Sequence, residues 1–138
     1  MAKTYNLFIS HSWAYSDAYE KLISLLDNAS HFSYRDYSVP KDDPIHDAPN
    51  SEALYEAIKR QMASCHVVLI MAGVYATYST WIKKEITIAQ TEFVNGKPIL
   101  GIKPWAQTNV SSVVSEAAVE IVSWNTDSIV QAIRRNAL

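Results

Sequence analysis

The chain has 138 residues, of which 49% are hydrophobic and 19% charged, a balance typical of one ordinary globular domain. Its formal net charge of −2 lacks the basic excess of nucleic-acid or anionic-membrane binders, so we expect neither partner. The sequence has no apolar run near the roughly 18 residues needed to cross a bilayer, no signal-peptide pattern and a single cysteine. These features predict one domain, residues 1–138, in the cytoplasm.

Strand and helix signals alternate along the first half of the chain. The apolar segment Tyr5–Ser10 predicts a first strand, and after the turn His11–Ala14 a helix follows to about Asn28. Phe32–Tyr37 alternates aromatic and polar residues, as strands at a sheet edge do. The polar, proline-bearing segment Ser38–Asn50 predicts a long loop, and loops of this length are often functional.

The second half continues the alternation. A helix begins at Ser51, and the nearly all-apolar segment His66–Ala72 predicts a strand covered on both faces. The remaining elements are a helix at Thr80–Val94, a strand at Lys97–Lys103, a loop with a short helix at Pro104–Ala118, a strand at Val119–Ser123 and a final helix. This order predicts an α/β, flavodoxin-like three-layer sandwich: a five-stranded parallel sheet of order 2-1-3-4-5 with helices on both faces.

Missing motifs exclude several functions that this architecture supports. With only three glycines, the chain has neither the dinucleotide-binding fingerprint nor a P-loop. Strand 1 ends in Ser10-His11-Ser12 and strand 3 in Met71-Ala72-Gly73, so the acidic residues of a phosphorelay receiver are absent. The first of these turns also lacks the glycines of a flavin phosphate loop. The four histidines have no metal-ligand spacing, so we expect no metal site.

Trp81 and Glu85 lie four residues apart on the helix that follows strand 3. With 3.6 residues per turn, Glu85 is about 100° from the Ile82/Ile86 stripe, which predicts a position on the flank of the core near the sheet rim. A carboxylate beside an indole suits a flat heterocycle joined to a ribose, where it stabilises oxocarbenium-like charge or holds a hydroxyl. The alternative is that Trp81 caps the core and Glu85 pairs with Lys84 or a neighbouring helix.

Two further polar segments follow strand ends. Ser10-His11-Ser12-Trp13 offers hydroxyls and backbone N–H groups for a pyrophosphate, or is a polar turn that caps the next helix. Asp36-Tyr37-Ser38 lines a nucleotide site, forms a self-association surface, or is an ordinary strand exit. Cys65 borders an apolar strand, which favours a small buried side chain over a nucleophile.

Taken together, these residues resemble the TIR-like family, and most closely its bacterial Thoeris branch. The matching segments are Phe8–Trp13, Tyr34–Pro40 with Asp43–His46, and Ser79–Glu85, which looks like the family's small-x-W-x-x-x-E helix. The segments occur in the family's order, and the resemblance runs from about Tyr5 to Val122.

The resemblance implies an activity. Enzymatic members cleave the nicotinamide–ribose bond of NAD, which is their substrate and not a cofactor, and the essential helix glutamate corresponds to Glu85, with Trp81 beside it. Ser10 to Trp13 and Asp36 to Ser38 would line the substrate site. Thoeris TIR-like proteins make an ADP-ribose-derived signal, often cyclic, that activates a separate effector, and catalytic TIR proteins often self-associate. We therefore expect an oligomeric NAD⁺ nucleosidase of antiviral defence; the alternative is a non-catalytic TIR-like interaction module.

Overall fold

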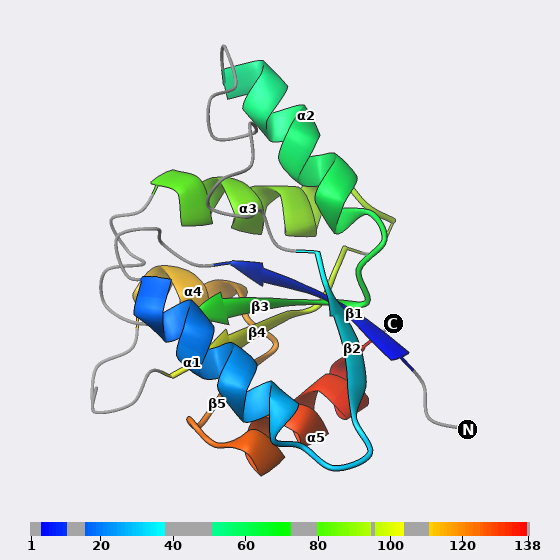
Figure 1. Ribbon diagram of the computed structural model, residues 1–138. Coiled ribbons are helices and arrows are strands. Elements are labelled where there is room, and N and C mark those ends of the chain that lie inside the picture. Colours follow the sequence, from blue (N-terminus) through cyan, green and yellow to red (C-terminus); the bar gives the residue numbers. More distant parts are fainter. Residues whose placement is uncertain are drawn as a thin grey trace.

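The computed structural model describes residues 4–10, 16–37, 51–72, 80–94, 96–103 and 111–137. The strands are β1 (Thr4–Ser10), β2 (Ser33–Asp36), β3 (Val67–Met71), β4 (Ile99–Ile102) and β5 (Glu120–Val122). The helices are α1 (Ser16–Asp27), α2 (Ser51–Met62), α3 (Thr80–Thr91), α4 (Ser112–Ala117) and α5 (Thr126–Asn136). All strand pairs are parallel and the order is β2-β1-β3-β4-β5, so the predicted flavodoxin-like fold is confirmed (Figure 1).

Helices cover both faces of the sheet, and an apolar core fills each side. Figure 1 shows α2 and α3 above the strands and α1 and α5 below them. Successive strand residues point to opposite faces, so Leu7 and Ile9 of β1 join the α1/α5 core while Phe8 joins the α2/α3 core. The central strand β3 is buried along its whole length, as its unbroken apolar sequence predicts for a doubly covered strand.

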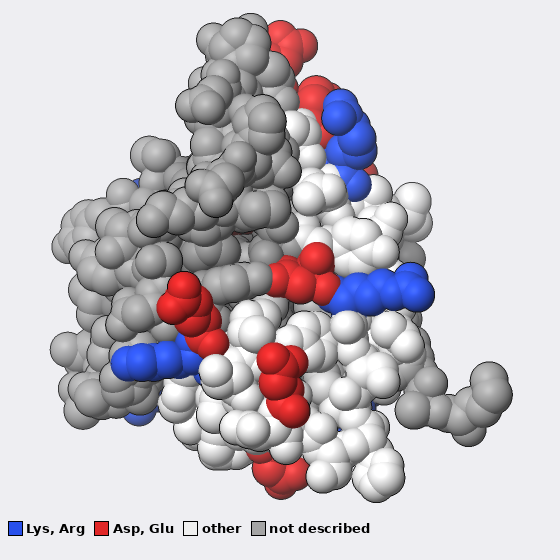
Figure 2. All heavy atoms as spheres, in the orientation of Figure 1, with Lys and Arg blue, Asp and Glu red and all other residues white. Residues whose placement is uncertain are grey.

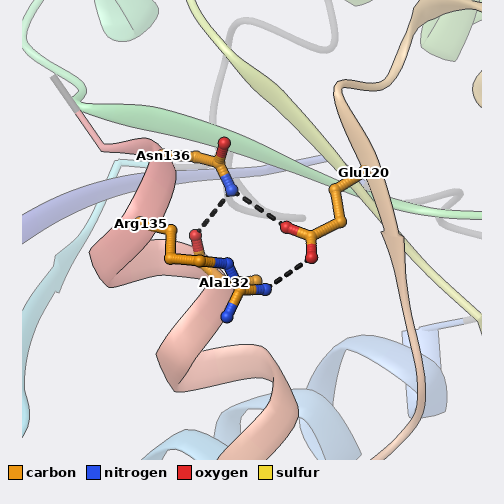
Figure 3. A network of polar contacts seen from close by, with 4 residues as sticks. All are labelled: Glu120, Ala132, Arg135 and Asn136. Carbon is orange, nitrogen blue, oxygen red and sulfur yellow. Dashed lines mark hydrogen bonds and ion pairs between the residues drawn. The ribbon is translucent and has the colours of Figure 1, made fainter.

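The two edge strands are short and differ in how they meet the rest of the fold. β2 is largely exposed, as predicted for an edge strand, and pairs only with β1. β5 pairs only with β4 and is joined to α5 through the Glu120 carboxylate, which accepts hydrogen bonds from Arg135 and Asn136 (Figure 3). Charged groups at an edge oppose pairing with another chain, and this pair also fixes α5 against the sheet.

The described surface carries charges of both signs. Figure 2 shows Lys and Arg side chains interspersed with Asp and Glu on the face drawn, with neither sign forming a large continuous field among the coloured residues. None of the described helices is long and apolar enough to cross a membrane.

Candidate functional site

The candidate site lies where β1 ends beneath α3. Ser10 is the last residue of β1, and its side chain points to the same face of the sheet as Phe8, toward α3. The Ser10 hydroxyl donates a hydrogen bond to Oε1 of Glu85. Both residues are 1% exposed, so the contact between strand and helix is closed to solvent. The structure thus brings together two candidate residues that lie 75 positions apart in the sequence.

This position is the topological switch point of the sheet. β1 lies between β2 and β3, and Ser10 stands beside Ile70 in the parallel ladder with β3. In open α/β sheets the crevice at the carboxyl ends of such strands is the usual ligand site. Glu85 therefore occupies the place in the fold at which a ligand-binding carboxylate is expected.

The prediction that Glu85 lies on the flank of the core underestimated how deeply its side chain is buried. Its exposure of 1% is as low as that of the predicted core residues Ile82 and Ile86, at 0% and 7%. The cause is tertiary: α3 packs on the sheet and also contacts α2 and α4, so more than one stripe of the helix is covered. A carboxylate in such a place needs hydrogen-bond partners to offset the loss of water, and the Ser10 hydroxyl supplies one.

A second carboxylate, Glu92, lies two turns further along and has a different environment. It accepts a hydrogen bond of 2.7 Å from the Tyr55 hydroxyl and forms an ion pair of 2.9 Å with Lys59 Nζ. Both partners are on α2. These partners hold the pKa of Glu92 below its usual value, while Glu92 raises the pKa values of Tyr55 and Lys59. The three groups join α2 to α3 at the rim where the strands begin.

The strand 2 candidates lie on the same rim as Ser10 but are set back from it. Asp36 ends β2 in register with Leu7, three residues before the end of β1, and is exposed. The Tyr37 backbone N–H donates to the Leu7 carbonyl at 2.8 Å, and its ring packs against the α2/α3 core. Tyr37 is therefore on the correct face of the sheet to approach the site.

The other candidates fall outside the described residues. His11, Ser12, Trp13 and Ser38 are not described, and for Trp81 only the helical backbone is. Their roles stay predictions. Among the described residues, no three His, Cys, Asp or Glu side chains group as metal ligands do.

Sequence reasoning placed Ser10 in the site but missed its partnership with Glu85. The available signal was the alternation of β1: Phe8 and Ser10 must share a face, and the helix after β3 packs on one of the two faces. The prediction for Cys65 is confirmed, since the side chain is 1% exposed and burial raises the pKa of its thiol to about 12. A thiol so rarely ionised at neutral pH is a poor nucleophile.

The five-stranded parallel sheet, with a helix carboxylate at its switch point, defines the class of the chain: a flavodoxin-like α/β domain. Residues 8–109 match the family model described as the TIR-like domain of the Thoeris protein ThsB, which covers more than half of the chain. The chain belongs to this family, and so has a TIR-type role in anti-phage defence alongside partner proteins. No curated protein matches the chain.

Proposed function

We propose that this chain is an enzyme that cleaves the nicotinamide–ribose bond of NAD, with Glu85 as its catalytic carboxylate. The single observation that carries the proposal is the buried Glu85 carboxylate, held by Ser10 at the switch point of the sheet. Membership of a TIR-like family supports the choice of NAD among nucleotide substrates. The reaction needs no metal and no resident cofactor.

Cleavage of the nicotinamide–ribose bond is favoured by a negative charge near the reacting carbon, C1′. As the bond between ribose C1′ and the pyridinium nitrogen breaks, its electron pair goes to the nitrogen and nicotinamide leaves as a neutral molecule. Positive charge then develops on C1′ and the ring oxygen, and a fixed carboxylate stabilises it. Attack on C1′ by water, or by a nucleophile of the ADP-ribose itself, followed by loss of a proton, gives a linear or a cyclic product.

The burial of Glu85 sets a condition on turnover. At 1% exposure, the carboxylate has no surface for a ribose to contact. Binding of NAD therefore requires a conformation in which Glu85 is uncovered, and a phage-dependent trigger or self-association of the chain supplies it. The ADP-ribose-derived product then carries the signal to a separate effector.

The same burial favours a second candidate function, a non-catalytic TIR-like module that contacts proteins. In that case Glu85 and Ser10 only join α3 to β1, and no substrate reaches them. Nicotinamide release distinguishes the two functions because an interaction module releases none.

The test is incubation of the purified chain with NAD, alone and with lysate from phage-infected cells, while nicotinamide is measured by chromatography. Release in the presence of the trigger, abolished in Glu85→Gln, is the expected result. Full turnover in Glu85→Gln would remove this residue from the mechanism. No release under any trigger would favour the interaction module.

A further inference from the structure

We propose that Ser10 is a positioning residue for Glu85, which acts on the reaction through the carboxylate and does not itself bind the substrate. The inference rests on the proposed NAD cleavage for its kinetic consequences, although the contact itself can be tested without any turnover. It replaces the expectation that the Ser10 hydroxyl holds a pyrophosphate.

The Ser10 hydroxyl is directed at the Glu85 carboxylate and away from solvent. Its side chain points inward to the α2/α3 face, donates to Glu85 Oε1 and is 1% exposed. A serine hydroxyl has a single proton to donate, and that of Ser10 is directed at the Glu85 carboxylate. The hydroxyl therefore serves Glu85 and has no second proton for a phosphate group.

Ser10 stands on a rigid element, because β1 is held in the ladder with β3. Ser10 is the last β1 residue in the ladder with β3, where it stands beside Ile70, and the preceding pairs extend back to Leu7 and Val67. Four consecutive ladder positions fix the direction of the Ser10 side chain, whereas a glutamate has three rotatable side-chain bonds. A functional group is positioned best when its partner sits on a rigid element. Ser10 thus fixes the orientation of the more flexible Glu85.

The hydrogen bond from Ser10 also acts on the charge of Glu85. A hydroxyl that donates to a carboxylate stabilises the ionised form over the protonated form. Such charge-assisted bonds are stronger than bonds between neutral groups. Ser10 therefore does two things for Glu85: it restricts the rotation of the carboxylate, and it favours the ionised form over the protonated form.

The chain offers a matched control in Ser111. This serine is 2% exposed, its hydroxyl accepts from the Val114 backbone N–H at the start of α4, and its own N–H donates to the Ala72 carbonyl at the end of β3. Ser111→Ala removes a buried hydroxyl near the same end of the sheet without removing a donor to Glu85. It therefore reports the cost of losing a buried hydroxyl that caps a helix and does not donate to Glu85.

The first measurement follows the carboxyl carbon of Glu85 by carbon-13 NMR against pH in the full chain, with its signal assigned from Glu85→Gln. We expect Ser10→Ala to move the titration midpoint of Glu85 to higher pH and Ser111→Ala to leave it in place, with both variants folded by circular dichroism. An unchanged midpoint in folded Ser10→Ala would overturn the proposal. So would an equal shift in both variants.

The second measurement compares the triggered release of nicotinamide by the same proteins. Loss of one hydrogen bond to a charged group predicts a kcat for Ser10→Ala that is about tenfold to hundredfold lower, with KM little changed and the acid limb of the pH–rate profile moved to higher pH. A raised KM with unchanged kcat would instead make Ser10 a substrate ligand and contradict the proposal. A shifted NMR midpoint in a protein that releases no nicotinamide would uphold the contact and remove NAD cleavage alone.

Discussion

Glu85 lies in the middle of α3 and Glu92 lies about two turns further along, just beyond the end of the helix, yet their carboxylates have opposite surroundings. Glu92, just beyond the helix end, is partly exposed and bonded to a cation and a phenol of α2, which hold its pKa down. Glu85 is closed to solvent and accepts from a neutral hydroxyl of the sheet at the rim where the strands end. The first arrangement joins two helices, and the second buries a carboxylate at the rim where open α/β sheets bind ligands.

The difference teaches that position within the fold and the kind of partner separate a structural carboxylate from a functional candidate. Lys97 completes the structural end: its Nζ donates to the carbonyls of Ala63 and Cys65 at 3.0 and 2.8 Å, and it lies 4.8 Å from the centroid of the Phe93 ring. These contacts tie the turn before β3 to the segment before β4. In the middle of α3, the hydrogen bond from Ser10 to Glu85 joins the helix to the end of β1.

The largest expected effect concerns Cys65, which lies at the structural end and should be chemically inert. With its thiol pKa raised to about 12 from an ordinary 9.0, the folded chain holds about 10³-fold less thiolate near pH 8 than the unfolded chain. The rate of alkylation by iodoacetamide, followed by mass spectrometry, should be lower without urea than with urea by at least that factor. Rapid alkylation of the folded protein would show that Cys65 is reactive and would contradict the assignment of a purely structural role to this end of the sheet.

The raised pKa of Cys65 also makes the free energy of unfolding depend on pH above neutrality. Below pH 9.0 the Cys65 thiol is protonated in both states, and its contribution to stability is fully present. Between pH 9.0 and about 12 only the unfolded thiol ionises, so that contribution is lost as pH rises. Cys65→Ala should lessen this alkaline loss in urea unfolding curves.

The next prediction tests whether the rate depends on the exact position of the Glu85 carboxylate. Glu85→Asp keeps the charge but withdraws the carboxylate by one methylene, and a displacement of about 1 Å in a reacting group can cost about 10²-fold in rate. We expect triggered nicotinamide release to fall by about that factor. Glu92→Asp, the matched change at the structural end, should leave the rate within about twofold, and equal losses in both variants would erase the distinction.

A smaller effect is expected from Lys97. Lys97→Met removes the donor to two backbone carbonyls, which should lower the free energy of unfolding by about 1 kcal/mol in urea titrations. Lys83→Met, an exposed change on α3, is the control and should be close to neutral. Neither change should alter the kcat of a triggered enzyme, since neither touches Glu85 or Ser10. A loss of kcat in Lys97→Met with stability intact would contradict the structural assignment of this end.

The smallest effect is that of the Glu92 contacts, which lie near solvent and are screened by it. Because the folded pKa of Glu92 is lowered, its contribution is present above the ordinary pKa of 4.5 and is lost as pH falls through the lower folded value. Glu92→Gln should therefore remove a slight acid dependence of the melting temperature and leave neutral stability nearly unchanged. A large loss at pH 7 would mean that Glu92 contributes more to the fold than its partly exposed position indicates.

The fold was largely predictable because local patterns determine it. The unbroken apolar run at β3 and the alternating strand and helix signals gave the order of elements along the chain, and the flavodoxin-like arrangement that suits it gave the strand order. All five strands fall within a residue or two of the predicted ranges. The bounds of β4 were less accurate, since Lys97 and Pro98 precede the strand. Proline lacks a ladder N–H, and the Lys97 N–H donates to Ala89 instead.

The site was only partly predictable because it depends on contacts between distant residues. Spacing placed Glu85 beside the core but could not give its burial, which requires α2, α4 and the sheet to close around α3. The Ser10 partnership requires the register of β1 against β3 together with the position of α3, and neither is written in local sequence. The Glu92 contacts with Tyr55 and Lys59 went unnoticed for the same reason.

The most direct measurement compares Glu85→Gln, on α3, with Glu92→Gln, just beyond it, in triggered nicotinamide release from NAD. The two changes are isosteric. Both variants should remain folded. We predict that Glu92→Gln keeps the wild-type rate and that Glu85→Gln loses at least about 10²–10³-fold, the scale of removing one group that stabilises developing charge. Equal rates in the two variants, with the wild type active, would contradict the assignment of catalysis to the buried carboxylate beside Ser10.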